Sequence, residues 1–509
     1  MNRPQIPYQP ISLGLALLSL GLVVFYFSWW FLPGNMGNLF LYWPLFAGEI
    51  YHAVMILFLY LTLWPQKPPG ESPVLKNFQP AVDVFITVAG EPAEVIYATA
   101  LAAREMRYHN FKIYLLNDGL ALNKPNWKEA KIIADKLGIT CLTRQTSQGA
   151  KAGNINHALR QTRGELVVIF DADMVPSRDF LEKTVPYFRD PQVGFVQTPQ
   201  YYANQETNEV TRGAWEQQEF FFGAIMRGKD SANAAFICGT NVVIRREALL
   251  SVGGMWEGSI AEDFITSVFI HQKGWRSHYV PEVLAQGLAP EDLLSYFKQQ
   301  LRWARGSLDM LFSHNPLFLT GLSWSQRREY LNSALYYVNG VVVVIDMIMP
   351  IIFLFTGLKP VVTPTTSFAL FFLPFILMTL YVLSRSSGGS LTFRAISFSQ
   401  ASWTIQLLAL KSVLLRQKMA FAITPKTAQE GNFLSLVYPH LAYIALVVIG
   451  SAVGIAREGF NPSIATNMAW AFFNVVIFLP FIRAAYPWEK LLGQKPAPAI
   501  SRGKAAVSP

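Results

Sequence analysis

Two aspartates separated by one residue are the first feature of this sequence that could do chemistry. Asp171 and Asp173 lie in the segment FDADMVP, directly after the apolar run ELVVIF. Carboxylates at the end of a strand can share a divalent cation, and Mg²⁺ and Mn²⁺ prefer oxygen ligands, often including substrate phosphates. A nucleotide diphosphate leaving group needs such charge neutralisation. The spacing therefore predicts a metal site, although the same pattern also arises by chance in many chains.

Two further segments carry groups suited to a nucleotide. Asp118 ends the run LLNDG, where its carboxylate could accept hydrogen bonds from a base or a ribose. A simple turn aspartate before Gly119 is the alternative. Lys151, in KAGNINHAL, stands at a predicted helix start, where a cation and free amides suit phosphate oxygens, and Gly153 would allow close approach of the backbone. A solvated loop lysine is the alternative there.

An acidic pair and an arginine–tryptophan motif complete the set. In AEDF, Asp263, beside Glu262, is a candidate base that would remove the proton of an acceptor hydroxyl opposite the leaving group. A helix N-terminal acid is the alternative. In QQLRWARG, which begins at Gln299, Arg302 could bind a diphosphate and Trp303 could stack on a sugar ring. Alone, such a pair is more often a membrane anchor.

The composition places these residues in a membrane protein. Hydrophobic residues make up 52% of the 509 residues and charged residues only 15%, against about 25% charged in soluble domains. The net charge of +9 lacks a dense basic run with interleaved aromatics, so we expect no nucleic-acid partner and assign the excess to cytoplasmic loops. Two cysteines, Cys141 and Cys238, cannot form a disulfide framework, and the other motifs leave a thiol nucleophile no role.

Long apolar stretches predict six membrane spans. They lie at about residues 11–31, 44–64, 334–355, 368–383, 436–455 and 468–482. Ionisable groups inside them, such as Glu49, His52, Asp346 and His440, indicate either a polar pathway or helix–helix hydrogen bonds. Basic residues concentrate in 385–433 and after the last span, so the positive-inside rule predicts that both termini are cytoplasmic.

The chain between the second and third predicted spans reads as an α/β domain. Short β-rich runs, among them VDVFITVAG, KIYLLNDG and GFVQTPQY, alternate with helical stretches. The predicted parts are two N-terminal transmembrane helices (1–76), a cytoplasmic α/β domain (77–312), four transmembrane helices with an interfacial helix at 391–416 (313–485), and a disordered cytoplasmic tail (486–509).

Taken in order, the Asp-Gly turn, the Asp-x-Asp, the acidic pair and the Gln-x-x-Arg-Trp resemble the cellulose synthase branch of the family-2 glycosyltransferases. FICGT (236–240) is similar to that family's acceptor-binding stretch, and FAITPK (421–426) to its gating loop, which closes over bound UDP-sugar. The resemblance covers about residues 40–485. It implies a multi-span α-helical membrane protein with an inserted cytoplasmic α/β GT-A (Rossmann-like) glycosyltransferase domain at 77–312 and a gating loop within 385–433.

By position, the resemblance also implies roles for individual residues. The nucleotide and diphosphate contacts would be Glu91, Asp118, Lys151, Asp171, Gln299, Arg302, Thr424 and Lys426. A Mg²⁺ or Mn²⁺ ion would be held by Asp173 and Asp171. Asp263, with Glu262, would be catalytic, and Trp303, Phe236 and Cys238 would contact the acceptor.

The implied reaction is inverting, processive transfer of glucose from UDP-glucose to a growing β-glucan, most simply the β-1,4 glucan cellulose, which crosses the membrane. Membrane lipids and an envelope subunit are the other expected partners. The sequence departs from the family at Ala89, Gly90 and Ala261, where Tyr, Asn and Thr are usual. It shows no PilZ barrel, so we expect no cyclic-di-GMP site in this chain.

Several alternatives remain open. A non-processive membrane glucosyltransferase with a lipid acceptor shares the Gln-x-x-Arg-Trp motif. The product could also be a β-1,3 or mixed-linkage glucan or a mannan. A transporter or scaffold with a degenerate transferase domain, or a nucleotide sensor, would not need the carboxylates that remain at 171, 173 and 263.

Overall fold

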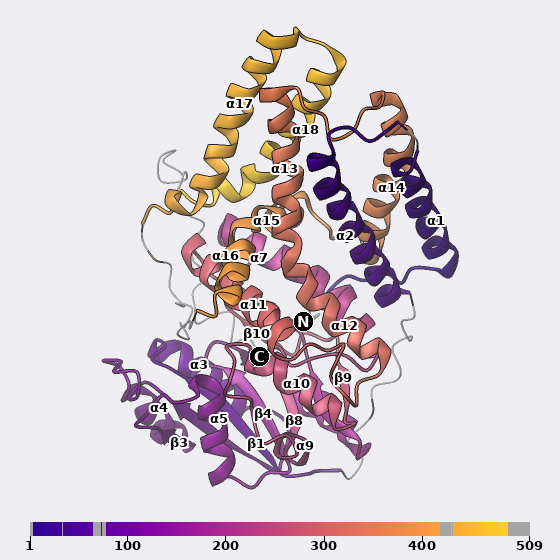
Figure 1. The fold of residues 1–509 in the computed structure, drawn as a ribbon. Coiled ribbons are helices and arrows are strands. Elements are labelled where there is room, and N and C mark those ends of the chain that lie inside the picture. The colour runs from indigo at the N-terminus through magenta and orange to yellow at the C-terminus, as the bar shows by residue number, and fades with distance from the viewer. Residues whose placement is uncertain are drawn as a thin grey trace.

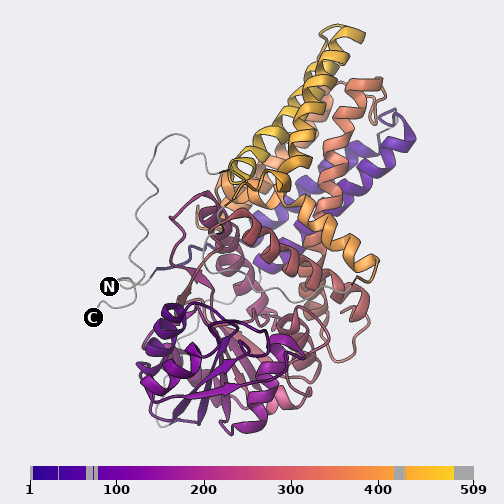
Figure 2. The same ribbon diagram turned by 90° about the vertical axis from the view of Figure 1, so that its left-hand side faces the viewer.

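The computed structural model describes residues 4–32, 34–64, 73, 78–417, 429 and 431–486. An α/β domain occupies one end of the molecule, and a group of long apolar helices occupies the other (Figure 1; Figure 2). This division confirms the predicted fold class, and it places the chain's candidate chemistry at the junction of the two parts.

A mixed sheet forms the centre of the α/β domain, in the order β3-β2-β1-β4-β8-β6-β9. The strands are β1 (Val82–Val88), β2 (Phe111–Asn117), β3 (Thr140–Thr143), β4 (Leu166–Asp171), β6 (Val193–Gln197), β8 (Val242–Arg245) and β9 (Arg276–Tyr279). Only β8 runs antiparallel to its neighbours. The central strands β1 and β4 are buried along nearly their whole length, as expected for strands covered by helices on both faces.

The register of this sheet brings the candidate residues to one edge. Strand β1 lies between β2 and β4, with Val88 opposite Asn117 and Thr87 opposite Asp171. Asp118 and Asp171 therefore emerge at the carboxyl ends of two strands that flank the same neighbour. The two aspartates therefore lie at the same edge of the sheet, the edge at which open α/β sheets generally bind ligands.

Helices cover both faces of the sheet and continue toward the membrane part. They are α3 (Ala93–Arg104), α4 (Glu129–Leu137), α5 (Ala150–Gln161), α6 (Phe180–Thr184), α7 (Glu209–Phe220), α8 (Met226–Ser231), α9 (Arg246–Leu250), α10 (Glu262–Gln272) and α11 (Leu293–Ser313). A second, three-stranded sheet contains β5 (Val175–Pro176), β10 (Ala285–Gly287) and β7 (Tyr201–Tyr202).

Six helical segments among the described residues are long and apolar enough to cross a membrane. They are α1 (Leu13–Trp30), α2 (Leu39–Leu63), α12 (Trp324–Leu335) with α13 (Asn339–Thr356), α14 (Thr365–Ser386), α17 (Tyr438–Glu458) with the short turn before it, and α18 (Pro462–Arg483). The predicted number and order of the spans are confirmed, and the chain is a multi-pass membrane protein. The third helical segment begins at Trp324, ten residues before the predicted Ala334. Hydropathy did not include these ten residues because α12 is rich in polar side chains.

The stretch predicted as one interfacial helix forms two. Helix α15 (Phe393–Ala401) ends at Ser402, whose hydroxyl donates to the Phe398 carbonyl at 2.7 Å, and α16 (Trp403–Leu414) follows. Helix α15 packs on α7 and α18, and α16 packs on α11 and α13. Both lie between the α/β domain and the membrane helices (Figure 1). The stretch therefore joins the two parts of the molecule and does not simply lie on a lipid surface.

Candidate active site

Lys151 links two of the segments that the sequence singled out. It lies in the first turn of α5, after Gly149, whose φ of +71° turns the chain into the helix. Its ammonium donates hydrogen bonds to the Asp171 carboxylate and, at 2.7 Å, to the Gly239 carbonyl. The side chain is only 13% exposed, so this lysine is not a solvated loop residue. It ties the end of β4 to the FICGT stretch.

The two aspartates of the Asp-x-Asp are held by the surrounding backbone. Thr87 Oγ1 donates to Asp171 Oδ1 at 3.2 Å, and the Asp171 N–H donates to Thr240 Oγ1 at 2.9 Å. The Asp171 side chain remains 36% exposed. Asp173 is buried, and its Oδ2 accepts from the Leu288 N–H at 3.3 Å. These contacts hold both carboxyl groups at the edge of the sheet where β4 ends.

The acidic pair lies beside Lys151. Glu262 and Asp263 begin α10, and the Asp263 carboxylate closely approaches Gly239. A Cβ placed on Gly239 would lie 3.0 Å from Asp263 Oδ2 and 3.7 Å from Lys151 Nζ. Gly239 also has a φ of +81°, which disfavours any side chain there. Because Gly239 has no side chain, the Asp263 carboxylate and the Lys151 ammonium can both lie close to it.

Burial and charge together set the ionisation of this cluster. Burial, and next the neighbouring Asp263, raise the pKa of Glu262 to about 7, against the opposing charges of Lys151 and Arg302. Burial likewise raises the pKa of Asp263, while the Phe264 N–H, Lys151 and Arg302 oppose the shift. Burial lowers the pKa of Lys151, but its carboxylate neighbours outweigh burial and raise it overall. A raised carboxyl pKa is the property required of a general base.

Helix α11 brings the Gln-x-x-Arg-Trp motif to the acidic pair. A Cβ on Gly306 would lie 2.3 Å from the Ala261 Cβ, so α11 packs tightly against the residue that precedes Glu262. Arg302 lies one helical turn before Gly306 and acts electrostatically on both acids of the pair. Trp303 is half-buried, and Gln299 is buried with its Oε1 lacking a hydrogen-bond partner among the described residues. The structure therefore joins all three predicted motifs.

Asp118 has a partner that the sequence did not reveal. Arg144 Nε and Nη2 donate to its two oxygens at 2.7 and 2.6 Å, and both side chains are buried. The loop after β3 supplies this arginine, which also donates to the Gln148 and Ala150 carbonyls. Burial raises the pKa of Asp118, and Arg144 opposes the shift. A direct nucleotide contact at Asp118 stays a prediction.

Gly153 serves the chain's own loop. A Cβ there would lie 2.1 Å from the Gln148 carbonyl oxygen and 2.9 Å from Arg144 Nη1. The close backbone approach expected at this glycine therefore occurs, but the group that approaches is the loop before α5. The same loop shapes the surroundings of Asp118 and Lys151.

The predicted acceptor residues lie behind the acidic pair. The Phe236 ring meets the Phe264 ring edge-on, with the ring centroids 4.7 Å apart. The Cys238 N–H donates to Gln197 Oε1 at 2.9 Å, and burial, followed by Asp263, holds the pKa of its thiol well above the usual range. A thiolate nucleophile is thereby disfavoured. Contacts of Phe236, Cys238 or Trp303 with an acceptor stay predictions.

Three predicted features remain outside this geometry. Glu91 Oε2 accepts from the Ala89 N–H at 2.6 Å, so its carboxylate shapes the turn after β1. Thr424 and Lys426 of the predicted gating loop lie outside the described residues, and so does the tail from residue 487. These roles stay predictions.

Four contributors to the site were not named individually from the sequence. Thr87 and Thr240 act through their hydroxyls, and Arg144 acts through its guanidinium. Gly239 acts through its backbone carbonyl and its lack of a side chain. Gly239 and Thr240 lie inside FICGT, so their position in that motif was the only available hint. Arg144 lies in no motif.

Two protein-family models match this chain. The chain matches the family model described as glycosyltransferase like family 2 over residues 80–306 and the cellulose synthase model over residues 250–432. The first range contains Asp171, Asp173, Asp263 and Arg302, and the second extends over the junction with the membrane helices.

Curated relatives cover most of this chain. It is 29% identical over 507 residues to the UDP-forming cellulose synthase catalytic subunit of Pseudomonas fluorescens (strain SBW25), covering 93% of this chain and 66% of that protein. It is 32% identical over 478 residues to the protein of the same name from Xanthomonas axonopodis pv. citri (strain 306), covering 89% and 64%. Cellulose synthase 2 of Novacetimonas hansenii is 30% identical, with 86% and 28% covered.

One solved structure shares the fold. The mannosyltransferase PcManGT from Pyrobaculum calidifontis, in complex with GDP-Man and Mn²⁺, matches with a TM-score of 0.51 and 18% identity. The match covers 79% of this chain and 100% of the mannosyltransferase. That match shows the fold alone. By the two family models and the curated relatives, this chain is similar to family-2 glycosyltransferases and to cellulose synthases, and it spans 66% or less of the length of those relatives.

Proposed function

We propose that the protein is an inverting, processive glycosyltransferase that polymerises glucose from UDP-glucose into a β-1,4 glucan and passes it through its membrane helices. The names of the curated relatives support the donor and the product. One observation carries the proposal: Lys151 contacts both Asp171 and the Gly239 carbonyl, and Asp263 lies against the same glycine. Arg302 acts electrostatically on Asp263 from the neighbouring helix α11.

This chain's residues divide the reaction between them. Asp263 takes the proton of the acceptor hydroxyl, whose oxygen forms a bond to the anomeric carbon on the face opposite UDP. The bond from that carbon to the diphosphate oxygen breaks, and UDP leaves with the electron pair. Lys151 and Arg302 stabilise the negative charge that develops on the diphosphate. Inversion at the anomeric carbon of an α-linked donor yields a β-linkage.

The aspartates at the end of β4 suit a divalent cation. Among the described residues, no group of three or more His, Cys, Asp or Glu side chains is placed to hold a metal. Asp171 and Asp173 would supply two carboxylates, and diphosphate oxygens and water would complete an oxygen-rich shell of the kind that Mg²⁺ and Mn²⁺ prefer. When bound, the ion would neutralise charge on the leaving group. Either Mg²⁺ or Mn²⁺ would suit these ligands, and the release experiment below compares the two.

A band of polar groups between the domain and the membrane helices supports passage of a polysaccharide. The Tyr296 hydroxyl on α11 donates to Gln217 Oε1 at 2.8 Å, and the Tyr336 hydroxyl lies 2.8 Å from Ser399 Oγ. Deeper in the membrane part, His52 on α2 lies 4.0 Å from Asp346 on α13. Hydroxyls and amides that interact across a helix junction suit the hydroxyl groups of a glucan.

The orientation proposed for the chain has the α/β domain in the cytoplasm. Residues 34–38 and 357–364 meet at the far end of the membrane helices, where Met36 pairs with Val361. The described part of the basic segment, residues 385–417, follows α14 and packs through α15 and α16 on α7 and α11 of the α/β domain. The positive-inside rule assigns that side to the cytoplasm, where UDP-sugars are made available.

Release of UDP by the purified, detergent-solubilised chain tests the donor and the metal. UDP-glucose, UDP-N-acetylglucosamine and GDP-mannose are supplied separately, with Mg²⁺, with Mn²⁺ or with EDTA. We expect nucleoside diphosphate release from UDP-glucose alone, and we expect EDTA to abolish it. Asp173→Asn removes a proposed metal ligand and should therefore raise the metal concentration needed for half-maximal release. Release that is equally fast in EDTA, or that occurs with GDP-mannose alone, would contradict the proposal.

A further inference from the structure

A pocket of about 420 Å³ lies where the N-terminal segment crosses between the α/β domain and the membrane helices. Residues 5–9, Arg227 of α8 and Gly388 after α14 line it. The segment is pinned on both sides: Gln5 pairs with Glu282 of the α/β domain, and the Gln9 N–H donates to the Ser386 carbonyl at 3.3 Å. The pocket is therefore built from parts of the chain that the fold holds together.

The pocket lies at the membrane boundary. Helix α1 begins at Leu13, shortly after the pocket-lining segment, and α14 ends at Ser386, two residues before Gly388. A Cβ on Gly388 would lie 2.8 Å from the Pro7 Cβ, and one on Gly223 would lie 2.8 Å from the Pro7 carbonyl oxygen. Pro7 therefore packs between the end of α14 and the helical turn that precedes α8, the helix of Arg227.

Arg227 brings a positive charge that no carboxylate compensates. Among the described residues, it forms no ion pair and its side chain donates no hydrogen bond, although Nε is buried. Its guanidinium carbon lies 5.1 Å from the centroid of the Tyr8 ring. Burial lowers the pKa of Arg227, and only the Tyr279 and Tyr8 hydroxyls oppose the shift. An arginine nevertheless stays charged at neutral pH.

Tyr8 adds a second donor without an acceptor. Its hydroxyl is buried and has no hydrogen-bond partner among the described residues. A buried donor left unsatisfied destabilises the fold, and more so when the group is charged. Tyr8 and Arg227 line the same pocket, and no acceptor among the described residues meets their side-chain donors, which indicates that the pocket receives one from outside the described chain.

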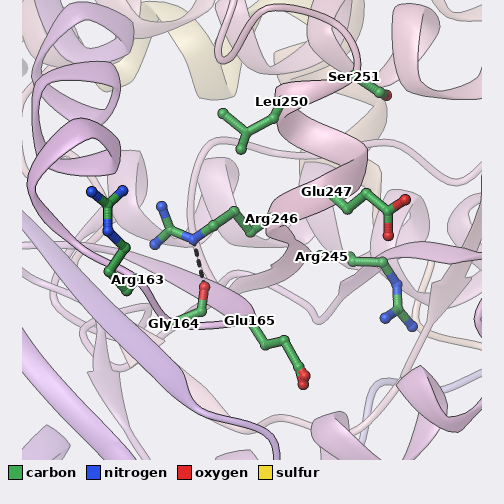
Figure 3. A pocket seen from close by; sticks show the side chains of 8 residues that line it. All are labelled: Arg163, Gly164, Glu165, Arg245, Arg246, Glu247, Leu250 and Ser251. Carbon is green, nitrogen blue, oxygen red and sulfur yellow. Dashed lines mark hydrogen bonds between the residues drawn. The ribbon is translucent and has the colours of Figure 1, made fainter.

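Two arginines of a second pocket show what satisfied guanidinium groups look like. Arg163, Arg245 and Arg246 line a pocket of about 580 Å³ at the edge of the sheet where β4 begins (Figure 3). There Arg246 already donates to Asp83 and to the Gly164 and Leu159 carbonyls, and Arg245 donates to three backbone carbonyls. Arg163 is exposed to solvent. Buried donors without a partner therefore distinguish the pocket at Arg227.

We propose that the pocket formed by residues 5–9, Arg227 and Gly388 binds the phosphate group of an anionic phospholipid. A phosphate offers several acceptor oxygens to the guanidinium fork and to the Tyr8 hydroxyl. The position at the base of α1 and α14 places the pocket at headgroup depth, on the side where positive charges meet an anionic leaflet. A bound headgroup would clamp the N-terminal segment between the two parts of the molecule.

Lipid binding can be measured without any assay of activity. The full chain is reconstituted into phosphatidylcholine nanodiscs with or without phosphatidylglycerol, and its unfolding temperature is followed by tryptophan fluorescence. Native mass spectrometry then counts the phosphatidylglycerol molecules retained by the purified protein. We expect phosphatidylglycerol to raise the midpoint by about 3 °C, since ligand that binds only the folded state stabilises it.

Variants assign the effect to the pocket. Arg227→Gln should abolish the shift and lose one retained phosphatidylglycerol, whereas Arg227→Lys should keep part of the effect. Tyr8→Phe removes only the hydroxyl and should reduce the shift, which covers the case in which Arg227→Gln does not fold. Arg327→Gln is the matched control, because this interfacial arginine also stacks on a ring, Trp324, at 5.3 Å but already donates to the Leu322 carbonyl.

Three results would overturn the proposal. The first is an equal shift and an equal lipid count in wild type, Arg227→Gln and Tyr8→Phe. The second is no retained phosphatidylglycerol in the wild type, which would leave water as the acceptor. The third is an equal shift from inorganic phosphate added to pure phosphatidylcholine discs, which would assign the pocket to a free anion. None of these readouts depends on the proposed transferase activity, so the two proposals fail separately.

Discussion

Asp263 is held among opposing influences at the centre of the candidate site. Burial raises its pKa, while Lys151, Arg302 and the Phe264 N–H favour its ionised form. These charges also lie where a diphosphate would bind, so the carboxylate that would receive the proton faces the groups that would stabilise the leaving group. One residue cluster thus serves both ends of the proposed displacement.

Replacing the proposed base should separate binding from transfer. Asp263→Asn keeps the size of the side chain and removes its ability to accept a proton at neutral pH. We expect the rate of sugar transfer to fall by about 10²–10⁴-fold, with UDP affinity, measured by isothermal titration calorimetry, nearly unchanged. Transfer at the wild-type rate would reject the assignment of the base. Asp309→Asn, late in α11, is a matched control and should have no effect.

The order in which the two acids ionise should decide the pH dependence. Burial, and next the Asp263 negative charge, raise the pKa of Glu262 to about 7. Because the Asp263 charge must already be present to raise that pKa, Asp263 loses its proton first, while Glu262 is still neutral. Glu262→Gln keeps this neutral form, so the acidic limb of the transfer rate, which follows Asp263, should stay in place. The measurement is initial rate against pH with saturating donor. A limb that moves to lower pH in Glu262→Gln would contradict this order of ionisation.

The sequence made Lys151, Asp171 and Asp263 predictable as site residues because each stands at a recognisable local position. Asp171 ends an apolar strand, and Lys151 and Asp263 begin helices. Arg144 was not predictable, because its contact with Asp118 depends on β3 pairing beside β2, with Thr143 opposite Asn117. Local order along the chain gives no sign of that pairing.

Three elements meet around one buried ion pair between the α/β domain and the membrane helices. Lys229 on α8 donates to Glu329 on α12 at 3.2 Å, and both side chains are almost fully buried. Thr62 on α2 and Arg328 also donate to the Glu329 carboxylate, at 2.8 and 2.6 Å. On its other side, the Lys229 ammonium lies 5.7 Å from the Phe236 ring centroid. The cluster therefore joins the acceptor stretch to two membrane helices.

Breaking this junction should destabilise the fold. Glu329→Gln leaves the buried Lys229 and the partly buried Arg328 without a carboxylate, and removing one partner of a buried ion pair typically costs about 3–5 kcal/mol. We expect a lower unfolding temperature in detergent and faster proteolysis between α8 and α12. The control is Asp135→Asn, which removes an exposed ion pair with Lys131 and should leave the unfolding temperature unchanged. An unaltered unfolding temperature in Glu329→Gln would show that the ion pair does not hold the elements together.

At the element scale, hydropathy predicted all six spans, because a membrane helix must be apolar along its length. Hydropathy placed the start of the third helical segment too late, and it did not predict that the stretch 391–416 divides into two helices at Ser402. Both errors have the same cause. Helices α12 and α16 pack partly on protein, so polar residues such as Gln326 and Gln406 are buried without marking a helix end.

The whole molecule places the candidate site at the junction of its two parts. Helix α11 carries Arg302 and Trp303 and packs on α16, which in turn packs on α13 of the membrane part. A product that leaves Asp263 along α11 would meet the Tyr296 and Gln217 pair before it reaches the membrane helices. This docking could not be predicted from sequence, because it depends on the shapes of helices distant along the chain, as in the fit of Gly306 onto Ala261.

Product analysis tests the central claim most directly. Radiolabelled UDP-glucose is supplied to the purified chain, and the label is recovered as ethanol-insoluble polymer and as lipid extract before digestion with linkage-specific glycanases. We predict ethanol-insoluble polymer that a β-1,4-glucanase clears, and none with Asp263→Asn. Clearance only by a β-1,3 or mixed-linkage glucanase would keep the mechanism and change the product. Label found only in the lipid extract would contradict processive synthesis and show that the protein glucosylates a lipid.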